Sequence, residues 1–115
     1  MQRLPKVLVS NVQLTTSAVT YYTAGTNVTT TIAAATVNNT SGTARTLTVH
    51  VIPSGGSATN SNQIVSALVI PAAGAAPTTL PGLVGQILPP GAFIQMLAEA
   101  ATCITPLVSG YESIV

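Results

Sequence analysis

His50 is the only histidine of this 115-residue chain and the first residue to consider for catalysis. A catalytic triad needs a carboxylate that orients the imidazole and a nucleophile beside it. The chain contains no aspartate, and its two glutamates, Glu99 and Glu112, are far from His50 in the sequence. Ser54 is close, but it follows Pro53 in a turn-forming stretch. The sequence therefore predicts no triad and an exposed or interface histidine.

The loop "PSGGSATNSN" (53–62) is rich in glycine and raises the question of phosphate binding. A phosphate-binding loop has the pattern GxxxxGK, followed by Ser or Thr and then a helix. This loop has no lysine, and the residues after it have the character of a strand. We predict a connection between two strands, which can also contact a neighbouring subunit.

Metal-binding and glycosidase chemistry are also poorly supported by the residues present. One histidine, one cysteine and two glutamates are scattered, without the close ligand spacing of zinc or calcium sites. A symmetric oligomer could still gather three copies of His50 or Glu112 on its axis. The glutamate pair could be an acid and base for glycoside cleavage, but the aromatic platforms of a sugar site are absent. We predict a protein that is not an enzyme and needs no cofactor.

Charge is the composition value that departs most from the average. Only 4% of residues are charged, against roughly 25% in an average soluble domain. Nucleic-acid binding depends on clustered lysine and arginine, so a net charge of +1 argues against it. The most apolar stretch, 66–77, is interrupted by Pro71 and Gly74 and is too short to span a membrane. A chain that is 47% hydrophobic with so little charge is expected to associate with other proteins.

The hydrophobic pattern has a period of two, which indicates β-strands. In "RTLTVHVI" (45–52), Leu47, Val49 and Val51 alternate with polar residues. The Thr-rich run 27–39 is predicted to pair with it as a hairpin through the turn "NNTSGT", with Gly42 at positive φ. Further strands are predicted over 7–14, 18–23, 63–70, 92–97, 102–108 and 111–114.

Two of the remaining stretches are less regular. The run 63–70 is apolar on both faces, which is expected for a strand in the middle of a sandwich or against a partner. The run 80–91 is ambiguous, and a helical turn there is an alternative. Together the pattern predicts an all-β chain with one domain over 1–115. We expect a single antiparallel β-sandwich or jelly-roll of about eight short strands.

Three long motifs carry a resemblance to a known class of proteins: "YYTAGTNVTTTIAAATVNNTSGTARTLTVHVIPSGG", "NQIVSALVIPAAG" and "LPGLVGQILPPGAFIQMLAEAATCITPLVSGYE". From about residue 19 to 112 the chain resembles small β-sandwich structural proteins of tailed-bacteriophage virions. It is most similar to capsid decoration, or cement, proteins. Similar domains also occur in collars, head fibres and tail tips.

The resemblance implies a location and partners. The protein is expected to be made in the host bacterial cytoplasm and to reside on the capsid surface of the virion. Its expected partners are the major capsid protein and itself, as a homotrimer, with no nucleic acid and no membrane. A collar, fibre or receptor-binding module is the alternative, and only that alternative includes carbohydrate binding.

Three segments are predicted to make these contacts. The N-terminal segment 1–9 is either an arm that reaches a neighbour or an ordinary edge strand. The glycine-rich loop and the stretch 83–90 are the other two. The candidate interface residues are Arg3, Lys6, Val7, Val9, Gly55, Gly56, Asn60, Leu83 and Ile87.

Overall fold

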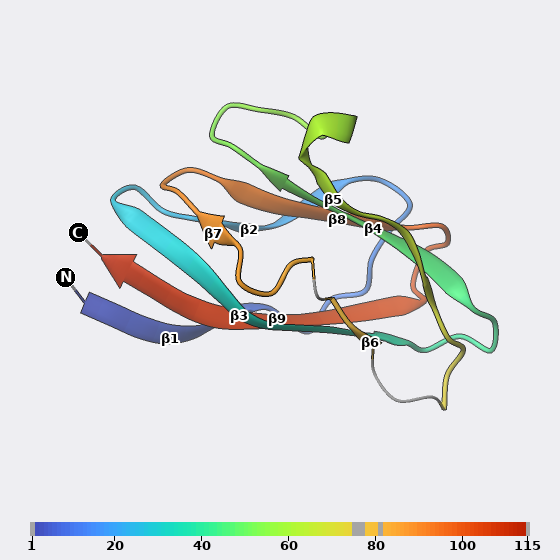
Figure 1. Cartoon of the computed structure of the whole chain (residues 1–115). Coiled ribbons are helices and arrows are strands. Elements are labelled where there is room, and N and C mark those ends of the chain that lie inside the picture. Colours follow the sequence, from blue (N-terminus) through green and yellow to red (C-terminus); the bar gives the residue numbers. More distant parts are fainter. Residues whose placement is uncertain (1, 75–77, 81, 115) are drawn as a thin grey trace.

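The structure, a computed structural model, describes residues 2–74, 78–80 and 82–114. It contains two antiparallel sheets packed face to face as a sandwich that measures 45 × 27 × 20 Å (Figure 1). The predicted all-β sandwich is therefore confirmed, with nine strands. The strands are β1 (Gln2–Val9), β2 (Val19–Thr23), β3 (Val28–Asn39), β4 (Arg45–Ile52), β5 (Gln63–Ile70), β6 (Thr78–Thr79), β7 (Ile87–Leu88), β8 (Phe93–Ala98) and β9 (Ile104–Ile114), and a short 3-10 helix, η1 (Asn60–Asn62), precedes β5.

The two sheets have different strand orders. Sheet A has the order β1-β9-β3-β6, and β7 also pairs with β3. Sheet B has the order β2-β8-β4-β5. In Figure 1 sheet B lies above sheet A, and the outer ends of β1 and β9 lie side by side near the two termini.

The core lies between the sheets and follows from the period-two pattern. In β8, for example, Ile94, Met96 and Ala98 are buried, whereas the alternate residues are only half-buried. Burial of a branched aliphatic side chain contributes about 1.5–3 kcal/mol, so the core holds the sheets together with little aromatic bulk. The largest fully buried side chains are Leu14, Ile32, Val37, Leu47, Ile52, Ile70, Leu80, Leu83, Leu88, Ile94, Met96 and Ile104.

The predicted hairpin between β3 and β4 is wrong. Both edges of β3 are already paired, one with β9 and the other with β6 and β7, so β4 has no free edge of β3 to join. The chain crosses instead to sheet B. Gly42 does not have the positive φ that was expected of it.

Asn39 directs this crossover from the end of β3. Its side chain is buried, and its Nδ2 donates hydrogen bonds to the carbonyl oxygens of Thr43 (2.8 Å) and Ile70 (3.2 Å). Its Oδ1 accepts from the backbone N–H and the hydroxyl of Ser41. Since Ile70 belongs to sheet B, the amide connects both sheets and holds the corner.

The N-terminal part of the chain also differs from its prediction. A strand was expected over 7–14, but β1 starts at Gln2 and ends at Val9. Asn11 then turns the chain with a left-handed φ of 57°. The segment expected to be an arm or an edge strand is the edge strand of sheet A, paired with β9 along its length. Pro5 suits this edge position because proline has no N–H to donate to a ladder.

The two strands predicted over 102–108 and 111–114 form one strand, β9. Gly110 lies in its middle, opposite Lys6 and Ile32. A side chain at Gly110 would collide with the carbonyl group of Thr31. Glycine is therefore required for a close approach of two strands, not for a turn.

β5 has the predicted bounds but a different place. It is the edge strand of sheet B, so the predicted place in the middle of the sandwich is wrong, and the alternative, a place against a partner, stays a prediction. Val65 and Ile70 face the core, whereas Val69 is exposed. The pairing with β4 is interrupted near Ala67, whose φ of 48° marks an irregularity.

The ambiguous run 80–91 forms a turn and then β7, without a helix among its described residues. The N–H groups of Leu83 and Val84 both donate to the carbonyl oxygen of Leu80. Leu80 and Leu83 are buried, and the N–H of Gly85 donates to the carbonyl oxygen of Ile32 (2.7 Å). This run therefore covers the second edge of β3.

Candidate contact surface on sheet A

The outer face of sheet A is identified by its register. Residues directly opposite each other in antiparallel strands point to the same face. Leu8 and Val108 face the core, so the alternate residues face outward. These include the opposed pairs Pro5 with Tyr111 and Val7 with Ser109. The row of Pro5 and Tyr111 continues across β3 to Thr31 and then to Ile87 of β7.

Three large apolar side chains on this face are exposed to solvent. Val7 is 55% exposed, Leu107 is 51% exposed and Ile87 is 59% exposed. Thr29, Thr36 and the other outward residues of β3 are small or weakly polar. Such a surface has little attraction for water and is suited to burial against another protein.

A hollow of about 350 Å³ lies on the same face, over β1, β9 and β3. Its walls are mostly apolar and include Pro5, Val7, Ala33 and Tyr111. The remaining lining comes from Lys6, Ser109 and Gly110. The hollow has room for one large side chain of a partner.

Arg3 is the one charged side chain that points outward from the described strands of sheet A. Its guanidinium lies over the ring of Tyr111, with Cζ 4.6 Å from the ring centroid. Such a cation–π contact contributes roughly 0.5–1 kcal/mol at an exposed site. The contact holds a positive charge next to the hollow.

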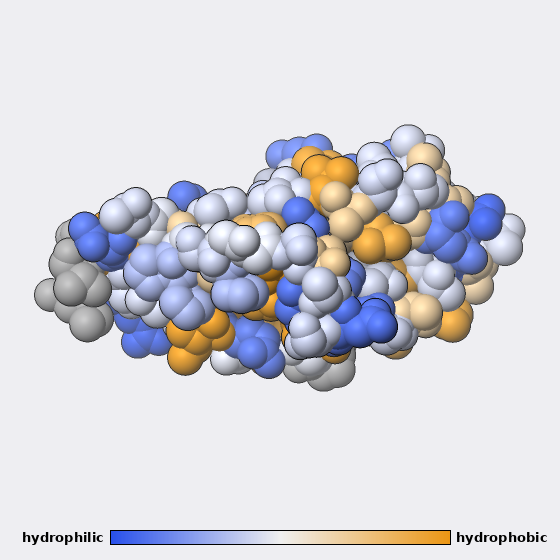
Figure 2. Space-filling model, turned by 90° about the horizontal axis from the view of Figure 1, so that it is seen from above, coloured by the Kyte–Doolittle hydropathy of each residue, from blue (hydrophilic) through white to orange (hydrophobic). Residues whose placement is uncertain are grey.

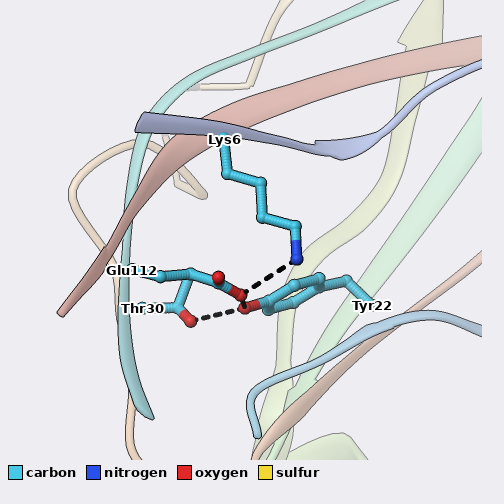
Figure 3. A network of polar contacts seen from close by, with 4 residues as sticks. All are labelled: Lys6, Tyr22, Thr30 and Glu112. Atoms are coloured by element: carbon cyan, nitrogen blue, oxygen red, sulfur yellow. Dashed lines mark hydrogen bonds and ion pairs between the residues drawn. The ribbon is translucent and has the colours of Figure 1, made fainter. Parts of the chain in front are cut away.

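Beneath this face, a polar cluster lies between the two sheets (Figure 3). The hydroxyl of Tyr22, from sheet B, donates a 2.5 Å hydrogen bond to Glu112 Oε2. It is also 2.6 Å from the hydroxyl of Thr30. Lys6 Nζ is 3.4 Å from the same carboxylate oxygen of Glu112 and 6.0 Å from the centroid of the Tyr22 ring.

Lys6, Tyr22, Thr30 and Glu112 form a structural cross-link between the two sheets, and we call these four residues the clasp. Burial raises the pKa of Tyr22 to about 12, and the hydrogen bond to Glu112 acts in the same direction. A tyrosine used as a nucleophile or base needs a lowered pKa, so this environment works against such a role. The carboxylate of Glu112 is occupied by Tyr22 and Lys6. The cluster fixes β1 and β2 against the rest of the sandwich.

His50 lies on the outer face of sheet B, but it is only 7% exposed, so the expectation of an exposed histidine is wrong. The loop 53–62 and η1 fold over it. Asn62 donates from Nδ2 to the carbonyl oxygen of Ser57, while its Oδ1 accepts from the backbone N–H of Thr59. This oxygen also accepts from His50 Nδ1 at 2.9 Å, which places a proton on Nδ1. His50 thus anchors the loop.

Possible metal ligands do not gather in the part of the chain that the structure describes. No group of three or more His, Cys, Asp or Glu side chains occurs there. Cys103 is buried just before β9.

The structure brings some predicted contact residues together and separates others. Arg3, Lys6 and Val7 surround or line the hollow, and Ile87 lies on the same face. Val9 and Leu83 are buried in the core, so their side chains cannot belong to a contact surface. The other three candidates, Gly55, Gly56 and Asn60, lie in the exposed loop over sheet B.

Pro5, Tyr111 and Leu107 were missed as contact candidates. The alternation of β9 is the signal that finds the last two. Leu107, Ser109 and Tyr111 alternate along β9 with buried residues such as Val108, so all three side chains point to the outer face.

Comparisons with models of known protein families, with curated proteins and with solved structures found no match to this chain. Within the described residues, no helix has the length and apolar character needed to cross a membrane.

Proposed function

We propose that this protein is a non-enzymatic structural protein of a tailed-bacteriophage virion. It binds the outside of the capsid as a decoration protein, associates with copies of itself, and stabilises contacts between major capsid subunits. The resemblance of residues 19–112 to such proteins motivates the proposal, and the outer face of sheet A supports it.

The observation that carries the proposal is the exposure of Val7, Leu107 and Ile87 on a face where Arg3 is the one outward charge among the described residues. A standard interface takes roughly 800 Å² from each partner, and the whole chain exposes 5754 Å². One sheet face is therefore large enough for such a contact. A partner that binds only the assembled shell stabilises that shell by mass action, and no chemical step is needed.

Quantitative mass spectrometry of purified particles tests the proposal. We expect the chain in an amount comparable to that of the major capsid protein. A small fraction of that amount would instead indicate a collar, head-fibre or tail-tip module. Absence from particles would contradict the virion assignment.

Substitutions on sheet A locate the contact. Leu107→Asp and Ile87→Asp each place a carboxylate on the face, and burial of an unpaired charge is costly. We expect both variants to occupy fewer sites on particles. Val84→Asp is the matched control because Val84 is also exposed but lies in the turn before β7. Unchanged occupancy of the Leu107 and Ile87 variants would exclude this face.

A further inference from the structure

Sheet B carries an apolar side chain and a carboxylate in one cross-strand row. Val69 of β5 lies opposite Thr46 of β4, on the outer face. Glu99, at the end of β8, lies on the other side of Thr46: its backbone N–H donates to the Thr46 carbonyl oxygen, and its Oε1 accepts from the Thr46 N–H, both at 3.2 Å. Neighbouring strands are about 4.8 Å apart, and the Glu99 carboxylate bends back to the Thr46 backbone, so its charge lies about one strand spacing from Val69.

Val69 is the kind of side chain that a hollow accepts. It is 59% exposed, as much as any large apolar residue of the described chain. Figure 2 shows this side of the molecule, where apolar side chains occur as separate spots among weakly polar and hydrophilic ones. We call Val69 and Glu99 together the knob.

The hollow on sheet A also lies beside a charge. Pro5, Val7 and Tyr111 line it, and the Arg3 guanidinium lies over the Tyr111 ring, with Cζ 4.6 Å from the ring centroid. On each sheet, an apolar site therefore lies next to a charge.

The charges are complementary. Arg3 is the one charge that points outward from the described strands of sheet A. On sheet B, Glu99 directly follows β8 and is exposed, whereas Arg45 of β4 lies opposite the buried Ile70 and is half-buried. A formal net charge of +1 adds little repulsion between two copies.

We propose that the knob of one copy binds the hollow of a second copy, with Val69 in the hollow and Glu99 paired with Arg3. The two surfaces lie on opposite faces, so the contact is head-to-tail and yields a closed ring or an open stack. Leu107 and Ile87 are not among the residues that line the hollow. This inference rests on the self-association included in the proposed function.

The test uses the purified full chain and measures its mass by light scattering or sedimentation over a range of concentrations. We expect the wild type to form oligomers, and Arg3→Glu and Glu99→Arg each to weaken association by about tenfold or more, since like charges then face each other. The double variant R3E/E99R restores opposite charges and should regain the wild-type mass. Val69→Asp should weaken association, whereas the control Val84→Asp should not.

Because Arg3 and Glu99 are exposed, the variants should keep the circular dichroism spectrum of the wild type. A monomeric wild type, single variants that associate normally, or a double variant without recovery would overturn the inference. Wild-type chain that is abundant on particles but monomeric in solution would overturn this inference and the proposed self-association, and would leave the proposed binding to the capsid standing. A chain that forms oligomers in solution but is absent from particles would overturn the proposed function and leave this inference standing.

Discussion

Tyr22 and Glu112 are 90 residues apart in the chain and lie in opposite sheets, yet the Tyr22 hydroxyl donates a 2.5 Å hydrogen bond to Glu112 Oε2. Thr30 and Lys6 contact the same pair from two further strands. The hydrogen bond exists only while the phenol keeps its proton. The stability of the sandwich is therefore linked to the protonation of one tyrosine.

The first prediction concerns alkaline pH. The pKa of Tyr22 is raised from 10.0 to about 12, so the folded state holds a proton that the unfolded state releases earlier. This contribution to stability is complete below pH 10 and is lost as the pH rises through about 12. We expect Tyr22→Phe to flatten the fall of the unfolding free energy between pH 10 and 12, measured by urea denaturation.

The control for this experiment is Tyr111→Phe, because Tyr111 lies on the outer face, away from the clasp. It should keep the steep wild-type dependence on pH. A Tyr22→Phe profile parallel to that of the wild type would show that the clasp does not govern the alkaline loss of stability.

The second prediction separates the two partners of Glu112. Glu112→Gln keeps the shape but removes the charged acceptor of Tyr22, and we expect a loss of about 1–3 kcal/mol in unfolding free energy. Lys6→Met should cost about 1 kcal/mol or less, because the ammonium group is largely exposed. Urea unfolding at neutral pH measures both. A larger loss for Lys6→Met would mean that the ion pair, not the phenol, stabilises this end of the sandwich.

Local patterns predicted the strands but not their partners. The alternation in β4 is a property of neighbouring residues, so this strand and its core side followed directly from the sequence. The clasp depends on residues from four strands, and no local pattern could have brought Tyr22 to Glu112. The predicted hairpin between β3 and β4 does not form because both edges of β3 pair with segments that are distant in the sequence.

The contact surface was predictable in the same partial way. The types of Arg3 and Val7 marked them as candidates, and their strand placed them on one face. Val9 was misjudged because β1 and β9 are out of register near that residue, which lies beside the core. His50 was correctly placed on the polar face of β4, but the loop that buries it is held by Asn62, twelve residues away.

The third prediction concerns the corner between the sheets. Asn39→Ala leaves the carbonyl oxygen of Ile70 without the Asn39 donor and releases the contacts to Ser41, all near the core. Loss of a buried partner costs about 1–3 kcal/mol, so we expect a destabilisation in this range, measured by thermal or urea unfolding. Asn38→Ala is the matched control at the adjacent exposed position, and its effect should stay within about 0.5 kcal/mol. Equal effects of the two variants would contradict the role assigned to Asn39.

The last prediction concerns the close approach of β3 and β9. Gly110→Ala adds a methyl group where the carbonyl of Thr31 lies, and the backbone can relieve the collision only by separating two central strands of sheet A. Overpacking of this kind costs about 1–3 kcal/mol, and hydrogen bonds of the ladder are lost in addition. We therefore expect a clear drop in the midpoint of urea unfolding. Gly42→Ala is the control, because a methyl group there meets nothing within 4 Å and the backbone is not left-handed. It should be neutral or stabilising by about 0.5 kcal/mol, since alanine restricts the unfolded chain. A Gly110→Ala variant as stable as the Gly42 variant would show that the strands can separate there without cost.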